Sequence, residues 1–310
     1  MFEHVDAYAG DPILTLNENF QKDPRPGRIN LSIGIYFDDA GRLPVMQAVR
    51  EAETALLQSI GPRGYLPMTG LAEYRTQIQH LLFGADHEAV TSGRTVTIQS
   101  LGGSGALKIG ADLLKRYFPD SEAWVSDPTW ENHRSIFEGA GFKVHDYPYY
   151  DAATGGVNFA AMLATLQAMP MHSIVLLHPC CHNPTGVDLS QEQWLQVVAV
   201  VVERRLIAFM DIAYQGFGDG IAEDGAAVQQ FLQAGLDFLV ATSFSKSFSL
   251  YGERVGALSV VTAAKDESAR VLSQIKRIVR TIYSSPSTHG AALVAGVLNS
   301  GELRGVWEAE

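Results

Sequence analysis

The chain has 310 residues, 46% of them hydrophobic, which is enough for one large domain or two smaller ones. Acidic residues outnumber basic ones by 34 to 23, giving a net charge of −11, and no lysine and arginine run of the kind that follows a nucleic-acid backbone occurs. These features argue against a nucleic-acid partner, and an anionic ligand would need individually placed arginines and backbone amides.

The N-terminus and the apolar stretches predict a soluble cytoplasmic protein without a membrane partner. The first six residues, MFEHVD, are polar and acidic and lack the basic and apolar regions of a signal peptide. The longest apolar stretch, residues 197–202, is too short to span a bilayer. Cys180 and Cys181 are adjacent, and neighbouring cysteines rarely pair, which fits a reducing compartment.

Residues 1–45 are rich in turn formers, as at 10–12 (GDP), 23–27 (DPRPG) and 38–41 (DDAG), which predicts an irregular arm with a strand or two. Further along, hydrophobic spacing predicts alternating helices and strands. Helices are expected over residues 47–57, 71–83, 104–117, 132–140, 191–203 and 226–234, with a long final helical region over 262–281. Strands are expected over residues 95–99, 123–125, 173–177, 206–210 and 238–241. The alternation predicts an α/β fold with a mostly parallel sheet, whose ligands bind at the carboxyl ends of the strands.

Lys246 follows the apolar strand 238–241 within the segment 242–249 (TSFSKSFS), and Arg254 comes eight positions later. Hydroxyl groups and an arginine are suited to a phosphate. A partly desolvated lysine without a nearby acidic residue can lose its proton and form a Schiff base with a carbonyl cofactor. Pyridoxal phosphate carries both an aldehyde and a phosphate. The alternative is a surface lysine that follows a strand.

A glycine-rich turn at residues 102–105 (GGSG) opens a helix directly after a strand. Amide groups at a helix start favour an anion, and Ser104 can add a hydroxyl, although tight turns also use glycine without any ligand. The spacing is neither a P-loop nor a dinucleotide fingerprint. A nucleotide-binding enzyme would need an acidic residue about 20 positions on, and Asp120 is a poor candidate.

Asp211 ends the strand 206–210, where its carboxylate either caps a helix or pairs with a cation such as a pyridinium nitrogen. Tyr214 could donate to the phenolic oxygen of such a ring. Trp130 could stack on the ring and His133 could brace a polar group, although each is more often plain packing. Arg280 could bind a carboxylate, and a solvated helix-end arginine is the commoner case.

The segment 178–186 (HPCCHNPTG) holds two histidines and two cysteines. Cys180 and Cys181 lack the two-residue gap that lets both thiolates face one ion, so no metal site is expected. Asn183 would offer its amide to a ring oxygen or a carboxylate. It precedes Pro184 in a sharp turn, for which either peptide isomer is open.

As an ordered set, five segments resemble the aspartate and aromatic amino-acid aminotransferases, most of all the bacterial tyrosine (aromatic) branch. They are 65–70 (YLPMTG), 127–133 (DPTWENH), 182–186 (HNPTG), 211–217 (DIAYQGF) and 243–246 (SFSK). The resemblance implies a three-layer PLP-transferase fold, with pyridoxal phosphate (PLP) as the cofactor and a mostly parallel central sheet. Residues 1–45 would be an N-terminal arm and the first part of a small domain, and residues 46–310 the large PLP-binding domain.

The resemblance also implies a role for each matching residue. Lys246 would form the internal aldimine and then move the α-proton, and Asp211, braced by His133, would pair with the pyridine nitrogen. The other cofactor contacts would be Tyr214 and Asn183 at the phenolic oxygen, Trp130 on the ring, and Gly103, Ser104, Ser243, Ser245 and Arg254 at the phosphate. The substrate would be contacted by Gly34, Trp130, Asn183 and Arg280.

A homodimer with shared active sites is implied as well, because Tyr65 would reach the phosphate of the neighbouring subunit and Arg280 the distal carboxylate of a dicarboxylic substrate there. The expected reaction is transamination between aromatic amino acids (tyrosine and phenylalanine, also aspartate and glutamate) and 2-oxoglutarate. The alternatives are an aspartate aminotransferase of the same family, a non-catalytic PLP-binding fragment because the segment that binds the α-carboxylate is missing, and a non-catalytic aminotransferase-like domain of a regulator. A regulator of that kind would carry an N-terminal DNA-binding region, which is not expected here.

Two departures from the family pattern stand out. Ser287 replaces a second proline that the family often has after Pro286. The chain also stops within an apparent helix, at 306–310 (VWEAE), where family members continue with a segment that completes the small domain and supplies the arginine for the α-carboxylate. The sequence is therefore expected to be truncated, to bind amino acids poorly and to aggregate through exposed apolar surface.

Overall fold

The computed structural model describes residues 1–7, 12–31, 34–59, 61–62 and 64–310, which divide into two compact units, Met1–Pro44 and Val45–Glu310. The described part of the first unit contains a helix, α1 (Pro12–Lys22), and no strand. The expectation of a strand or two there is therefore wrong for these residues. Pro12 stands at the first helical position, where the backbone N–H that proline lacks has no helical partner in any case.

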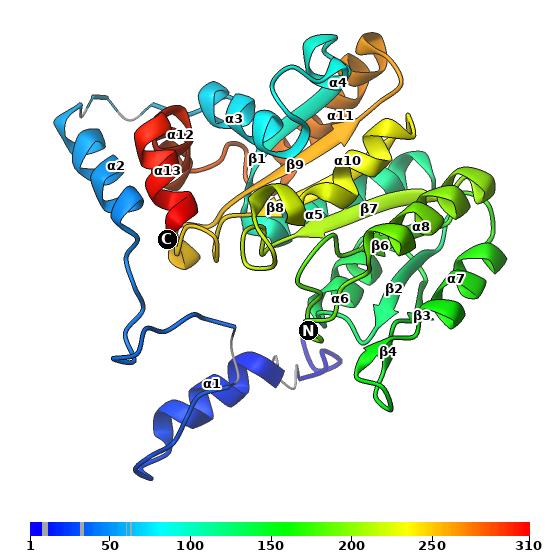
Figure 1. The fold of residues 1–310 in the computed structure, drawn as a ribbon, viewed down its shortest axis with the longest axis horizontal. Coiled ribbons are helices and arrows are strands. Elements are labelled where there is room, and N and C mark those ends of the chain that lie inside the picture. Colours follow the sequence, from blue (N-terminus) through cyan, green and yellow to red (C-terminus); the bar gives the residue numbers. More distant parts are fainter. Residues whose placement is uncertain (8–11, 32–33, 60, 63) are drawn as a thin grey trace. The chain divides into compact units, whose positions relative to one another are not determined.

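Seven strands form the central sheet of the second unit, in the order β1-β9-β8-β7-β6-β2-β3 (Figure 1). They are β1 (Thr95–Leu101), β2 (Ala123–Asp127), β3 (Val144–Pro148), β6 (Ile174–Leu177), β7 (Ile207–Ile212), β8 (Phe238–Ser243) and β9 (Val255–Val261). Strand β9 runs antiparallel to its two neighbours, and the other pairs are parallel. The sheet is thus mostly parallel, as predicted, and β4 (Tyr150–Asp151) and β5 (Gly156–Val157) make a small separate one.

The predicted helices are present, with ends that differ by a few residues at most. The helices of the second unit are α2 (Gln47–Gln58), α3 (Ala72–Phe83), α4 (Glu88–Thr91), α5 (Gly102–Tyr117), α6 (Asn132–Gly139), α7 (Phe159–Ala168), α8 (Gln191–Arg204), α9 (Ile221–Asp224), α10 (Ala226–Gln233), the 3-10 turn η1 (Tyr251–Glu253), α11 (Lys265–Ile282), α12 (His289–Asn299) and α13 (Gly301–Ala309). The long helix α11 is not the final one, because α12 and α13 follow it.

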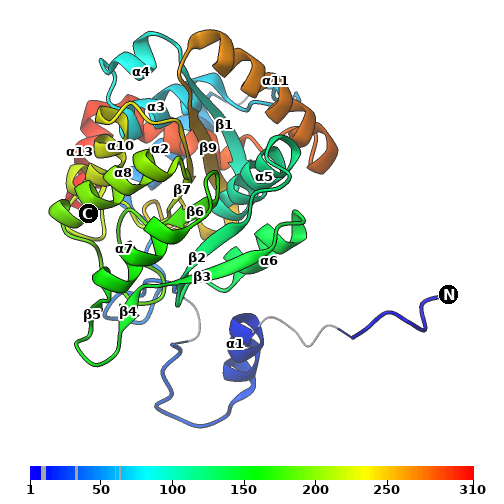
Figure 2. The ribbon, with the colours of Figure 1, turned by 90° about the vertical axis from the view of Figure 1, so that its right-hand side faces the viewer.

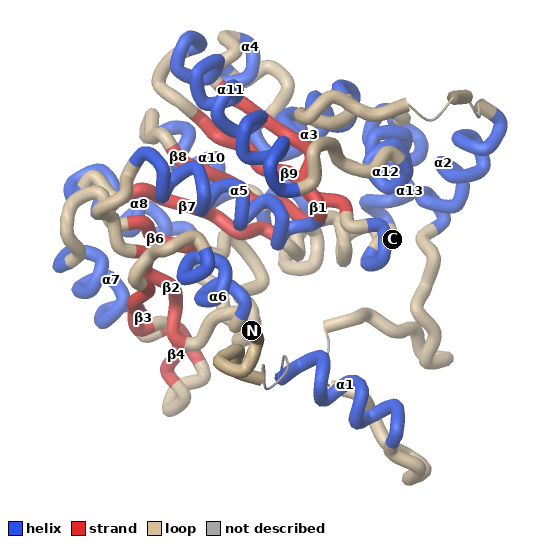
Figure 3. Tube along the Cα trace, turned by 180° about the vertical axis from the view of Figure 1, so that it is seen from behind, coloured by secondary structure: helices blue, strands red, loops and turns tan. Residues whose placement is uncertain are grey.

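Helices cover both faces of the sheet, which makes three layers (Figures 2 and 3). Side chains of β7 and β8 alternate between two cores: Met210 and Val240 belong to one, Phe209 and Leu239 to the other. The first core also holds residues of α3, α7, α8, α10 and α12, and the second those of α5, α6 and α11. Burial on both faces explains why the central strands are continuous apolar runs in the sequence.

The strand register brings the functional segments to one edge of the sheet. Leu101 pairs with Val255 across β1 and β9, while Ser243 pairs with Gly256 across β8 and β9. The carboxyl ends of β1 and β8 therefore meet the start of β9, and the carboxyl end of β7 lies beside that of β8, where Ile212 pairs with Thr242. Among the helices of the described residues, none combines the length and the apolar character needed to cross a membrane.

Candidate active site

Lys246 lies in the turn that follows β8, and its side chain is partly buried. Its Nζ atom is 5.1 Å from the centre of the Tyr214 ring. Burial lowers the pKa of the Lys246 amine below the ordinary 10.5; the negative charge of Asp211 raises this pKa again, and the positive charge of Arg254 lowers it. The neutral, nucleophilic form of the amine is therefore more accessible here than at an exposed lysine.

Asp211, near the end of β7, is held by a buried histidine from α6. The His133 Nε2 and Asp211 Oδ2 atoms are 2.8 Å apart, and the other ring nitrogen of His133 is 2.8 Å from the Thr129 hydroxyl. A carboxylate only accepts hydrogen bonds, so the His133 Nε2–H donates to Asp211, while Nδ1 is bonded to the Thr129 hydroxyl. The edge of the Trp130 ring packs on His133, with centroids 5.1 Å apart. These contacts fix the direction in which Asp211 points.

The glycine turn and Arg254 form a compact cradle at the start of α5. Gly102 has a left-handed φ of 67°, and a Cβ atom there would lie 2.4 Å from the Arg254 guanidinium. A Cβ atom on Gly103 would lie 3.2 Å from that of Ser243. Arg254 Nη1 donates to Ser245 Oγ at 3.3 Å, and α5 has no side-chain cap. Uncapped amides, two hydroxyls and a guanidinium thus converge as an anion site requires.

The segment after β6 places two neutral histidines behind Asp211. Burial lowers the pKa of His178 well below 6.5, and it lowers the pKa of His182 to about 3. The His178 ring lies 5.1 Å from the His133 ring, and the Asn183 backbone N–H donates to its Nδ1 atom at 3.3 Å. Asn183 precedes Pro184 through a cis peptide bond. His178 was not among the residues predicted for the site, although its position directly after a buried strand was a signal.

Two predicted site residues of the second unit, Tyr65 and Arg280, stand apart from this group. Tyr65 is completely exposed. Arg280, at the end of α11, is exposed and donates to the Ser284 hydroxyl. Gly34 belongs to the first unit. Within the described part of one chain, no hydrogen bond or ion pair joins Tyr65 or Arg280 to the residues around Lys246.

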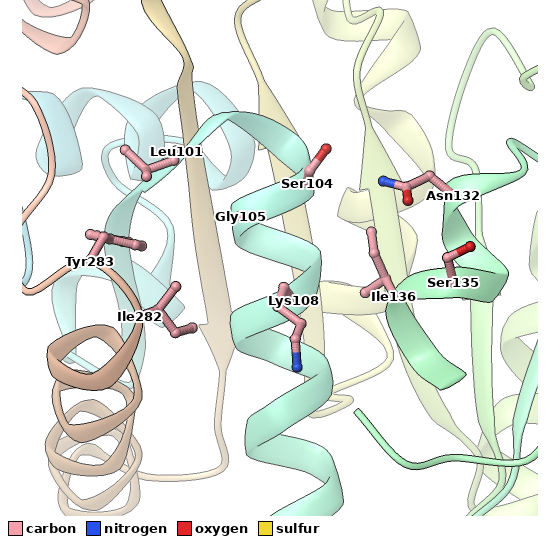
Figure 4. A pocket seen from close by; sticks show the side chains of 9 residues that line it. All are labelled: Leu101, Ser104, Gly105, Lys108, Asn132, Ser135, Ile136, Ile282 and Tyr283. Carbon is pink, nitrogen blue, oxygen red and sulfur yellow. The ribbon is translucent and has the colours of Figure 1, made fainter. Parts of the chain in front are cut away.

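A pocket of about 360 Å³ lies over the outer side of α5. Side chains from α5, α6 and the end of α11 line it, including Ser104, Asn132 and Tyr283 (Figure 4). Ser104 is the one predicted cofactor residue among its lining, so this pocket is distinct from the surroundings of Lys246.

A mostly parallel α/β sheet with a partly buried lysine, a braced carboxylate and an anion cradle at one edge defines a candidate cofactor-dependent enzyme. Residues 26–310 match the family described as aminotransferase class I and II. The chain is 59% identical over 311 residues to the aromatic-amino-acid aminotransferase of Escherichia coli and 58% identical over 310 residues to the aspartate aminotransferase of Pseudomonas aeruginosa. Both matches cover 100% of this chain and 78% of the relative.

The structure is similar to that of the aromatic-amino-acid aminotransferase from Burkholderia pseudomallei, which was solved covalently bound to pyridoxal phosphate. The TM-score is 0.97 at 56% identity, covering 100% of this chain and 77% of the other. The chain therefore belongs to the class I and II aminotransferases. It has the three-layer PLP-transferase fold and is an aminotransferase with pyridoxal phosphate as its cofactor.

The residues around Lys246 fit this cofactor. Its phosphate needs the cationic, amide-lined cradle that Gly102 and Gly103, which lack a Cβ atom, leave open next to Arg254. Its ring nitrogen needs a carboxylate, which Asp211 offers from a fixed position. Its aldehyde needs an amine that can lose a proton, which Lys246 offers.

Proposed function

We propose that this enzyme transfers amino groups between aromatic amino acids, tyrosine and phenylalanine, and 2-oxoglutarate, and that it also accepts aspartate and glutamate. The observation that carries the proposal is the placement of the Lys246 amine beside Tyr214, Asp211 and Arg254 at one sheet edge. Support for aromatic donors comes from the names of the E. coli relative and the B. pseudomallei structure. The P. aeruginosa relative, named an aspartate aminotransferase, supports aspartate.

Each residue of the site takes one task in this proposal. When bound, pyridoxal phosphate supplies an aldehyde for amines and a ring that accepts electrons. The Lys246 amine would hold the cofactor through its aldehyde, and it would act as the base and acid for the proton at the substrate α-carbon. Asp211, positioned by His133, accepts the hydrogen bond of the protonated ring nitrogen. Ser104, Ser243, Ser245, Arg254 and the Gly103 amide hold the phosphate.

The remaining contacts of the proposal concern the ring and the substrate. Tyr214 and Asn183 donate to the phenolic oxygen, and Trp130 stacks on the ring. Gly34 and Arg280 bind the substrate together with Trp130 and Asn183. Tyr65 and Arg280 act in the active site of a second subunit, which fits their exposure on the single chain and requires a homodimer.

The proposal includes domains and location. Residues 46–310 form the large cofactor-binding domain, and residues 1–45 an arm with the first part of a small domain, a boundary supported by the division after Pro44. We place the homodimer in the cytoplasm, in keeping with two free cysteines and bacterial relatives.

The decisive experiment measures keto-acid formation from tyrosine, phenylalanine and aspartate, each with 2-oxoglutarate, on purified protein supplied with pyridoxal phosphate. We expect turnover with all three donors, with kcat/KM for the aromatic donors at least equal to that for aspartate. Turnover with aspartate alone would replace the aromatic assignment with an aspartate aminotransferase. Cofactor binding without turnover of any donor would refute the enzymatic proposal.

The phosphate cradle makes a separate prediction. A Gly102→Ala change places a methyl group against the Arg254 guanidinium and forces alanine into a left-handed φ of 67°. We expect the dissociation constant for pyridoxal phosphate to rise at least about tenfold, the equivalent of about 1.4 kcal/mol. Fluorescence titration of the apoenzyme with pyridoxal phosphate measures this dissociation constant.

Gly139→Ala is the matched control, because a Cβ atom at Gly139 meets nothing within 4 Å and its φ is ordinary. Unchanged cofactor affinity in Gly102→Ala, or an equal loss in both variants, would contradict the cradle.

A further inference from the structure

Cys180, Cys181 and the carboxylate of Asp224, which is distant from them in the sequence, form a cluster that has no role in the proposed aminotransferase reaction. One ligand atom from each of Cys180, Cys181 and Asp224 lies within 4.8 Å of the other two. Both thiols are free. Spacing alone argued against a shared ion, because adjacent residues of an extended chain point to opposite sides. Cys181 departs from that geometry with a left-handed φ of 47°, and Asp224 is added by the fold from the end of α9.

Asp224 is fixed as a metal ligand must be. It is 5% exposed, and its carboxylate accepts the backbone N–H groups of Gly216 at 2.7 Å, Gly218 at 3.0 Å and Asp219 at 3.0 Å. Two of these bonds end on Oδ2 and one on Oδ1. A carboxylate offers about four lone-pair positions, so one on Oδ1 remains for a ligand.

The groups around the cysteines are acidic. Asp224 belongs to the cluster, and the Asp188 carboxylate accepts the backbone N–H groups of Cys181 at 2.6 Å and His182 at 2.8 Å. Two thiolates beside these carboxylates would repel one another without a cation between them. Cys181 is partly exposed and gives an ion access from solvent.

We propose that Cys180, Cys181 and Asp224 form a binding site for a thiophilic divalent cation of the Zn²⁺ or Cd²⁺ class. Two sulfur ligands and one carboxylate oxygen, with a water molecule, make the four-coordinate shell that such ions prefer, whereas Mg²⁺ prefers oxygen ligands only. Binding converts two thiols and one free ion into a bis-thiolate complex and releases two protons to the buffer. The Cys181 sulfur lies 3.9 Å from the Tyr214 carbonyl oxygen, so the ion would sit next to the aminotransferase site without sharing a ligand with it.

The test is a titration of the reduced full chain with Cd²⁺, followed by ultraviolet thiolate-to-metal absorption and by calorimetry. The chain has only two cysteines, so any thiolate band reports this pair. We expect one ion per chain and no displacement by excess Mg²⁺. Cys180→Ser and Cys181→Ser should each weaken binding at least about tenfold, and the double variant should lose the band.

Asp224→Asn should weaken binding about tenfold, while Asp237→Asn, which alters an exposed carboxylate outside the cluster, should leave it unchanged. Circular dichroism checks that each variant folds. If Asp224→Asn does not fold, the binding data of the cysteine variants and the number of ions per chain still test the proposed site. Absence of the band at equimolar Cd²⁺, one ion per two chains, or affinity unaffected by both serine replacements would overturn the site. None of these readouts depends on aminotransferase activity.

Discussion

Lys246→Ala is expected to reduce transamination at least about 10³-fold in kcat while the protein stays folded. In the proposed function the amine would do two things that alanine cannot do: it would hold the cofactor aldehyde, and it would move a proton at the substrate α-carbon. Its local setting is specific, because burial lowers its pKa while Asp211 opposes that shift. Single-turnover kinetics with tyrosine measure the loss, and circular dichroism confirms the fold.

Two control variants show whether the loss of activity comes from the missing reactive amine or only from the missing positive charge. Lys143→Ala removes a lysine whose side chain is 70% exposed and paired with Glu122, so its activity should match that of the parent. Lys246→Arg keeps the positive charge but offers no nitrogen that can lose its proton, so it should be as inactive as Lys246→Ala. Borohydride reduction followed by mass spectrometry should find the cofactor on Lys246 in the parent protein. Normal turnover in Lys246→Ala would remove the basis of the assignment.

The edge of the sheet was predictable because strand ends can be read from the sequence. The buried apolar runs end at Asp211 and just before Lys246, and parallel strands present those ends on the same side. The glycine turn was predictable in the same way, because it follows an apolar run and opens a helix. Residue type and position along the chain were sufficient for these features.

Other features depend on long-range pairing that no local pattern carries. The contact between Gly102 and Arg254 requires β1 to pair with β9, an antiparallel strand that the sequence analysis did not predict. The cluster of Cys180 and Cys181 with Asp224 requires the end of α9 to fold back on the segment after β6. In both cases the partners are joined by tertiary packing, so their spacing in the sequence has no recognisable period. Helix α1 was missed for a different reason: its proline was taken as a turn signal, although proline also suits the first turn of a helix.

Asp211→Asn is expected to lower kcat about 10²- to 10³-fold with a much smaller effect on the substrate KM. Asparagine has nearly the same shape, and its amide oxygen can still accept the His133 Nε2–H bond that Asp211 accepts at 2.8 Å. The change therefore removes a charge and keeps the geometry. Without that charge the cofactor ring nitrogen loses its anionic partner, and the ring accepts electrons less readily. The Lys246 pKa, which Asp211 raises, should also fall.

Steady-state kinetics measure the loss in kcat, and a pH titration of the bound cofactor's absorption measures the fall in the Lys246 pKa. Two control variants show whether the charge or the position of the carboxylate causes these changes. His133→Gln weakens the support of the carboxylate but keeps its charge, so we expect an intermediate loss in kcat. Asp146→Asn removes a half-exposed carboxylate paired with Arg134 on the surface and should change neither quantity. If Asp211→Asn kept kcat within about threefold of the parent, or if His133→Gln were the more damaging change, geometry rather than charge would be the contribution of this pair. The asparagine amide of Asp211→Asn reproduces the hydrogen bond to His133, whereas His133→Gln weakens it and keeps the charge. The difference in kcat between Asp211→Asn and His133→Gln therefore measures what the negative charge contributes.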